Sequence, residues 1–250
     1  MTQYIKYLIF FLLLVSIKLL AEPEIRLAVL PFKNVIKNEK YDWLSDGFCE
    51  SLTTGLTQVE SIRLIERSMI ESVLKEQKRS KSDLFDPETA VELGRLLGAN
   101  KVLVGSYQVL SEKILVNARI VDVATGEIAK NGAVGNLIED YTNCFNLHVK
   151  LVGLVVQSFN LNLTQKEQSK ITSVTTNSTQ EITAYEAYVL GRNAFLLFTP
   201  YGYNRAIMWY QKAVEVDTKY ALAHAGLASA YTYWGFERSW AGQSYKIFLQ

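Results

Sequence analysis

The stretch Leu27-Ala-Val-Leu-Pro-Phe-Lys-Asn34 is the part of the chain that says most about its fold. An apolar run that closes near Pro31 is typical of a buried strand that leaves its sheet. Residues 101–110 and 113–123 form two more apolar segments, and only Ser111 and Glu112 lie between them, which is the spacing of a hairpin. The sequence therefore predicts a sheet made of a first strand and a distant hairpin.

Helical segments separate these strands. From Tyr41 to Leu56 the apolar residues recur every three or four positions, which predicts an amphipathic helix whose opposite face carries Asp46 and Glu50. The remaining predicted elements are, in order, a strand at 62–65, helices at 69–77 and 87–98, the hairpin, a third antiparallel strand near 127–134, and a helix at 137–159 that covers the sheet. This order, βαβααβββα, predicts an α/β domain with a mixed sheet.

The composition changes after this domain. Residues 164–183 are rich in Thr, Ser, Gln, Asn and Lys and poor in apolar residues, which predicts a linker that is at most partly helical at its start. We therefore expect an α/β domain over 22–160, a linker over 161–183 and an α-helical region over 184–250.

Residues 1–21 have the pattern of a secretory signal peptide. Lys6 supplies positive charge, an apolar run follows from Leu8 to Val15, and Ala21 is a small residue at a cleavage position. The alternative is an uncleaved anchor, because Lys18 interrupts the apolar character. No cysteine follows Ala21, which argues against a lipid anchor. We expect an exported protein that is periplasmic or associated with the outer membrane of a bacterium.

Charge and cysteine content exclude several classes of protein. Of the 26 basic residues, the signal contains two, so 24 remain against 25 acidic residues, and this near-neutral balance gives no electrostatic basis for binding nucleic acid. Cys49 and Cys144 are the only cysteines, too few for a cysteine-rich zinc site. They could pair in an oxidising compartment, but both lie on apolar helix faces, where buried free thiols are the ordinary state.

The sequence contains no recognisable set of catalytic, cofactor-binding or metal-binding residues. It has neither a GxxxxGK[ST] loop nor a GxGxxG turn after a strand. We expect His148 and His224 to be packing residues, and we interpret Glu66 with Arg67 as an ion pair at a strand end and Asp122 as a turn residue. We therefore predict a protein that is not an enzyme and carries no cofactor.

The first part of the chain resembles a known family of envelope domains. The residues that carry the resemblance are Ala28-Val-Leu-Pro-Phe-Lys-Asn34, Leu44-Ser-Asp-Gly47, Leu64-Ile-Glu-Arg-Ser68, Leu97-Gly-Ala99, Val104-Gly-Ser106 and Ala118-Arg-Ile-Val-Asp-Val-Ala-Thr-Gly126. This ordered set is similar to the TolB-like amino-terminal domain, which is related to the FlgO and CsgG families. The resemblance implies a cell-envelope context. The short turn at Ser111 and Glu112 and the missing lipidated cysteine differ from the pore-forming branch, so we expect no pore.

The helical region resembles a tetratricopeptide (TPR) array. Leu190 and Gly191 fit a first helix, and Tyr220-Ala-Leu-Ala-His-Ala-Gly-Leu-Ala-Ser-Ala-Tyr231 fits the start of the next repeat. About one and a half repeats are present, fewer than the roughly three that a self-standing array needs. Either these helices lean on the α/β domain, or the array is truncated at Gln250.

A TPR tandem implies a groove that binds a protein partner. Aromatic and arginine side chains are typical contact residues, although they could equally pack within an incomplete array. The predicted partner-binding residues are Tyr185, Tyr188, Arg192, Phe195, Ser229, Thr232 and Tyr233.

These features lead to one main hypothesis and two alternatives. The main hypothesis is an exported, non-enzymatic scaffold or adaptor of the cell envelope that binds protein partners through both parts of the chain. The first alternative is an accessory of an outer-membrane secretion system. The second is a ligand-binding sensor domain of a regulatory protein.

Overall fold

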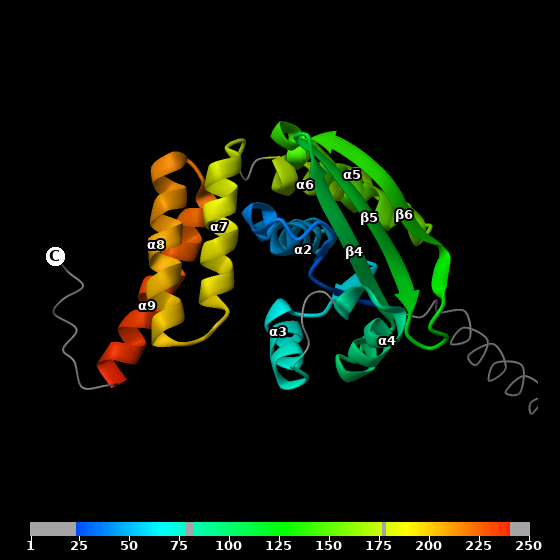
Figure 1. Ribbon diagram of the computed structural model, residues 1–250, viewed down its shortest axis with the longest axis horizontal. Helices are drawn as coiled ribbons and strands as arrows, with labels where there is room; N and C mark the ends of the chain where they lie inside the picture. Colours follow the sequence, from blue (N-terminus) through cyan, green and yellow to red (C-terminus); the bar gives the residue numbers. More distant parts are fainter. Residues whose placement is uncertain (1–23, 79–82, 177–178, 241–250) are drawn as a thin grey trace, which may run out of the picture.

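The chain contains one mixed sheet with helices on both faces and three helices at one side (Figure 1). The computed structural model describes residues 24–78, 83–176 and 179–240. The strands are β1 (Ile25–Val29), β2 (Lys33–Asn34), β3 (Ile62–Leu64), β4 (Lys101–Leu110), β5 (Lys113–Asp122) and β6 (Ile128–Asp140).

The strand order is β3-β1-β4-β5-β6, and β2 pairs with β4 beyond the end of β1. Strand β1 is parallel to β3 and β4, whereas β4, β5 and β6 form an antiparallel meander. The predicted mixed sheet is confirmed. At the β4–β5 turn, Ser111 and Glu112 both have positive φ, 48° and 61°, the backbone conformation that lets a two-residue turn follow the twist of its strands.

Helices cover the two faces of the sheet in different ways. Helices α2 (Trp43–Leu56), α5 (Cys144–Ser158) and α6 (Gln165–Thr176) lie on one face, and α3 (Arg67–Glu76) and α4 (Pro87–Leu96) lie on the other (Figure 1). Short 3-10 helices occur at Glu39–Tyr41, Asp83–Phe85 and Tyr141–Asn143. In β5 the alternate residues Ile114, Val116, Ala118 and Ile120 are all buried in the core beneath α2 and α5.

The Pro31-Phe32 turn explains why the first strand ends where it does. Phe32 is fully buried, and its ring lies over Gly105 of β4. A Cβ atom at Gly105 would come within 2.1 Å of the Phe32 ring, so only glycine allows this approach. The sequence motif therefore joins the first strand to the hairpin.

Two predictions about boundaries and one about exposure need correction. The helix expected from Leu137 begins at Cys144, because residues 137–140 continue β6. Most of the predicted linker is helix α6, whose Ile171 is only 2% exposed. Asp46, expected on the outer face of its helix, is 3% exposed. The predicted signal peptide lies outside the described residues.

The last three helices pack consecutively. They are α7 (Ile182–Phe195), α8 (Pro200–Val216) and α9 (Ala221–Trp240). Gly191 of α7 and Gly226 of α9 both face the ring of Tyr210 in α8, and a Cβ atom at either glycine would lie 2.7 Å from that ring. Helix α7 also packs against α2, so this helical part leans on the α/β part (Figure 1).

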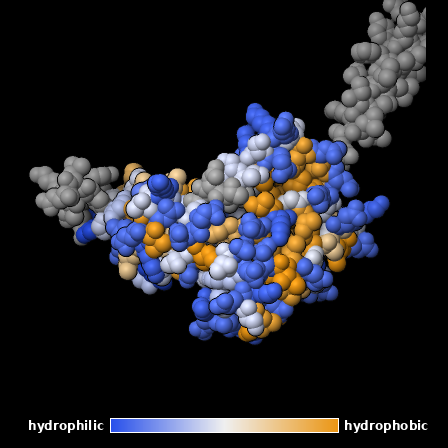
Figure 2. Space-filling model, turned by 90° about the horizontal axis from the view of Figure 1, so that it is seen from above, coloured by the Kyte–Doolittle hydropathy of each residue, from blue (hydrophilic) through white to orange (hydrophobic). Residues whose placement is uncertain are grey.

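The sheet is uncovered near the β4–β5 turn. Leu110 and Ile138 are 57% and 60% exposed, and Val35, which bonds to the backbone of Tyr107, is 50% exposed. The strand register places Gln108, Leu115 and Ile138 side by side, so the apolar side chains of Leu115 and Ile138 lie on one face beside the polar Gln108. Figure 2 shows hydrophobic surface at this end of the molecule.

Candidate functional site

The contact between α7 and α2 is made largely by polar side chains, and we call it the junction. The hydroxyl of Tyr185 donates a hydrogen bond of 2.7 Å to the carbonyl oxygen of Gly47 in the middle of α2. The hydroxyl of Tyr188 donates to the carboxylate of Glu50 at 3.4 Å. Both tyrosines are almost fully buried, so α7 has one side-chain arrangement against α2.

A buried cluster of charges lies at the centre of the junction. The guanidinium of Arg67, 5% exposed, contacts Asp46 at 3.0 Å and Glu50 at 3.1 Å. Asn193 of α7 accepts a hydrogen bond from Arg67 at 2.6 Å and donates one to Asp46 at 2.7 Å. Three helices therefore share one ionic network, because α2 supplies the carboxylates, α3 the arginine and α7 the amide.

This arrangement follows from local sequence spacing. Asp46 and Glu50 are four residues apart, so they lie on the same face of α2. Arg67 is the first residue of α3, which follows the short strand β3 beside β1. Buried ions remain charged only when their partners are close, and each carboxylate here has at least two donors. The geometry can hold two parts of a chain together, but it offers no nucleophile or acid–base pair in an open cleft.

His148 of α5 lies in a ring cluster next to the junction. Its ring centroid is 5.2 Å from that of Phe48 and 5.5 Å from that of Tyr185. Burial lowers the pKa of His148 from 6.5 to about 3, so the side chain is neutral at pH 7. Its Nε2 atom has no hydrogen-bond partner within the described part of the chain. The prediction that His148 is a packing residue is confirmed.

His224 differs from that prediction. It is exposed, and its Nε2 atom lies 2.9 Å from the carbonyl oxygen of Thr218.

The two cysteines are buried and unpaired, and burial raises the pKa of each thiol to about 12. Across residues 24–78, 83–176 and 179–240, no three His, Cys, Asp or Glu side chains form a possible metal site.

A second cluster of aromatic rings lies where α7 turns into α8. The ring of Phe195 contacts those of Phe198, Tyr203 and Tyr233 at centroid distances of 6.0, 5.6 and 5.4 Å. Phe198 and Tyr233 are each 50% exposed. Phe198 also has a φ of +48°, which is uncommon for an aromatic residue. Half-exposed rings on a buried aromatic base are typical contact points for another protein.

The structure divides the predicted partner-binding residues into three sets. Tyr185, Tyr188 and Arg192 lie at the junction, where the Arg192 guanidinium is 3.6 Å from Glu50. Phe195 and Tyr233 belong to the second aromatic cluster. Ser229 and Thr232 are exposed on α9, and their hydroxyls donate to backbone carbonyls of the same helix. Their role in binding a partner stays a prediction.

Sequence reasoning missed the residues that make the junction specific. Arg67 was expected to pair at a strand end, but it pairs with Asp46 and Glu50 and bonds to Asn193. The only local signal was the four-residue spacing of Asp46 and Glu50, and nothing in the sequence indicates that Asn193 meets them.

Comparison with known proteins finds a family model that is similar to the first part of the chain. Residues 14–110 match the family described as "Curli production assembly/transport component CsgG". This part is similar to CsgG. The CsgG-like part includes β1 to β4 and the helices between them, which contain the Asp46, Glu50 and Arg67 side of the junction.

A curated relative covers more of the chain. "Putative adenylate cyclase 3" of Rhizobium meliloti (strain 1021) is 27% identical over 208 residues, which are 83% of this chain and 32% of the relative. The chain thus spans about a third of the length of that relative.

Two solved structures are similar at low identity. Lipoprotein GNA1162 from Neisseria meningitidis is 21% identical with a TM-score of 0.41, and the match covers 57% of this chain and all of that one. The LpoB C-terminal domain from Salmonella enterica is 20% identical with a TM-score of 0.36, over 47% of this chain and 83% of that one. TM-scores this low establish no shared function. No helix within the described residues is long and apolar enough to span a membrane.

Proposed function

We propose that this protein is an exported, non-enzymatic adaptor of the bacterial cell envelope that binds one protein through its CsgG-like part and another through its TPR-like helices. The observation that carries the proposal is the junction, in which Arg67, Asn193 and Tyr185 fix the two parts to each other. An adaptor needs such a contact, because partners held by a flexible tether would not keep a defined geometry.

Each part presents a surface that suits a protein partner. On the CsgG-like side, the uncovered sheet near the β4–β5 turn exposes Leu110, Ile138 and Val35. On the helical side, Phe198 and Tyr233 are half-exposed beside the polar Ser229 and Thr232 of α9. Phe195 supports the helical surface from within, because its ring contacts those of Phe198 and Tyr233. Apolar anchors with a polar rim are the usual composition of a protein interface.

The envelope setting is supported by the family description of residues 14–110, which names a component of curli assembly and transport. The same description favours a second candidate, an accessory component of an outer-membrane secretion system. Assembly state separates the two candidates. A large ring on gel filtration of the membrane-extracted protein favours the secretion accessory, whereas a soluble monomer or dimer favours the adaptor.

The adaptor proposal is tested by capture of partners from a bacterial envelope extract. Replacing Thr232 with Lys and Tyr233 with Ala changes the helical surface without touching the junction. We expect this variant to lose one set of captured proteins and to keep the set bound by the CsgG-like part. The matched control is Tyr201→Ala, which removes another exposed ring of the helical part, 67% exposed. Identical capture by all three proteins would refute the role of this surface.

A further inference from the structure

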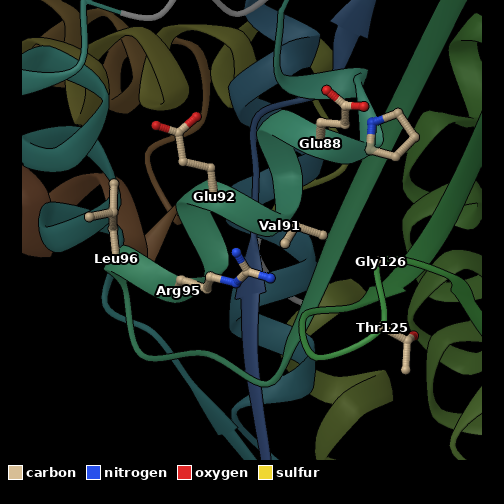
Figure 3. A pocket seen from close by; sticks show the side chains of 8 residues that line it. Glu88, Val91, Glu92, Arg95, Leu96, Thr125 and Gly126 are labelled. Carbon is tan, nitrogen blue, oxygen red and sulfur yellow. The ribbon is translucent and has the colours of Figure 1, made fainter.

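A cavity of about 520 Å³ lies between α4 and the turn that joins β5 to β6, away from the junction (Figure 3). Helix α4 contributes one side of the cavity, and Thr125 and Gly126 contribute the other. In Figure 3, Val91 and Arg95 extend from the helix toward the turn. The adaptor function proposed above does not involve this cavity.

The floor of the cavity is apolar and its walls are fixed. Val91 is partly buried, and its Cγ2 atom lies 3.7 Å from the position that a Cβ atom would take at Gly126, so the helix and the turn are in contact. Gly126 has a φ of +77°, which favours glycine. The carboxylate of Asp122 accepts hydrogen bonds from the backbone of Ala124 and Thr125 at 2.9 and 3.1 Å, which holds the turn in place.

Opposite charges lie at the two ends of the cavity, and a second carboxylate, that of Glu92, lines it between them. Glu88 is in the first turn of α4 and Arg95 is in the last turn. Seven residues of helix separate them, which corresponds to about 10 Å along the axis. Neither side chain has an ion-pair partner in the part of the chain that the structure describes. The helix dipole favours an acidic residue in the first turn and a basic residue in the last turn, but it does not explain the cavity between them.

Another arginine near the start of α4 is already engaged. Arg119 stacks on the ring of Phe85 with 4.2 Å between the guanidinium and the ring centroid, and it donates to the Phe85 carbonyl oxygen. Arg95, by contrast, is exposed beside Leu96, which is itself 52% exposed. The cavity thus has the carboxylate of Glu88 at one end, Val91 facing the turn, and the exposed guanidinium of Arg95 at the other end.

We propose that this cavity binds an extended peptide segment with a basic side chain and a carboxylate three residues apart and an apolar side chain between them. An extended chain advances about 3.3 Å per residue, so three residues span about the 10 Å that separates Glu88 from Arg95. The basic side chain pairs with Glu88, the apolar side chain lies on Val91, and the carboxylate pairs with Arg95. An intact helix, about 10–12 Å wide with its side chains, does not fit a cavity of this size.

Fluorescence anisotropy with labelled, capped tetrapeptides tests the proposal on the full chain. Wild-type protein should bind Lys-Leu-Ser-Glu at least about tenfold more tightly than Glu-Leu-Ser-Glu or the uncharged Gln-Leu-Ser-Gln. Glu88→Lys should shift the preference to Glu-Leu-Ser-Glu, and Arg95→Glu should shift it to Lys-Leu-Ser-Lys. The matched control is Glu112→Lys, which reverses an exposed charge on the distant β4–β5 turn and should keep the wild-type order.

Two results would overturn the peptide site. One is no binding of any peptide by folded wild-type protein at millimolar concentration. The other is the same order of affinities in wild type, Glu88→Lys and Arg95→Glu, with folding of each variant checked by circular dichroism. Either result leaves the adaptor proposal intact, because the tested residues lie outside the junction and the helical surface.

Discussion

The junction and the contact of α5 with the sheet are both buried, but their chemistry is opposite. Helix α5 covers the sheet with Leu147, Leu151 and Val155, which are all fully buried. Helix α7 meets α2 through tyrosine hydroxyls, an amide and an arginine shared by two carboxylates. Apolar packing tolerates small shifts, whereas a hydrogen-bonded ionic network has one satisfied geometry. The difference teaches that apolar packing alone holds α5 on the sheet, whereas the junction also fixes the orientation of α7.

The largest expected effect comes from removing the cation of the junction. Arg67→Met leaves Asp46 and Glu50 buried with their main partner missing, which typically costs about 3–5 kcal/mol. Urea denaturation of wild type and variant measures the loss. The control is Arg63→Met, because Arg63 pairs with Glu24 on the surface, where its side chain is 72% exposed. Equal stability of the Arg67 variant and the wild type would show that the network does not hold the fold.

The second prediction concerns a shortened side chain in the apolar contact between α5 and the sheet. Leu151→Ala deletes a fully buried side chain of α5 and should cost about 2–4 kcal/mol, since such a site collapses only partly. The same urea experiment measures this change. Unlike the Arg67 variant, the Leu151 variant should keep α7 in its place against α2. Selective loss of hydrogen-exchange protection in α7 of the Leu151 variant would contradict the claim that the position of α7 depends on the junction.

Acid should destabilise the protein through His148. The folded state holds the pKa of His148 at about 3 against an ordinary value of 6.5, so the unfolded state binds more protons between these two pH values. Stability therefore falls as the pH falls from 6.5 toward 3, by about 2 kcal/mol at pH 5 from this group alone. His148→Phe should reduce the acid dependence measured by urea denaturation at several pH values. An unchanged pH dependence of stability in this variant would show that groups other than His148 cause the acid sensitivity.

The smallest effect concerns a single hydroxyl at the junction. Tyr185→Phe removes the donor to Gly47 without opening a cavity and should cost about 1 kcal/mol. Tyr201→Phe is the matched control, because Tyr201 is 67% exposed and should change stability little. If both substitutions cost the same in thermal unfolding, the Gly47 bond adds nothing to the junction.

Local patterns explain which parts of the fold are predictable. The hairpin and helices α2, α3 and α4 follow from strand alternation, helix periodicity and the Pro87 start signal. The start of α5 was misplaced because β6 continues through irregular pairing near Asn131 and Asn136, which have φ values of 61° and 57°. Such a strand shows no clear alternation, so periodicity alone cannot find its end.

The start of helix α6 has a sequence signal, although the polar composition of residues 164–183 favours a linker. Thr164 and Glu167 form a capping box, in which the Thr164 hydroxyl accepts from the Glu167 backbone and the Glu167 carboxylate accepts from the Thr164 backbone. The junction gave no comparable signal. Asn193 lies 147 positions beyond Asp46 in the sequence, and only the folded chain brings them together.

The central claim is that the junction fixes the helical part to the α/β part in one arrangement. Spin labels at Leu96→Cys and Met208→Cys, both exposed positions, allow the distance between α4 and α8 to be measured by double electron–electron resonance. The native cysteines are buried with pKa values raised to about 12, so they stay unlabelled. We predict a single narrow distance distribution in wild type that broadens in Asn193→Ala. A broad distribution in wild type would contradict the claim.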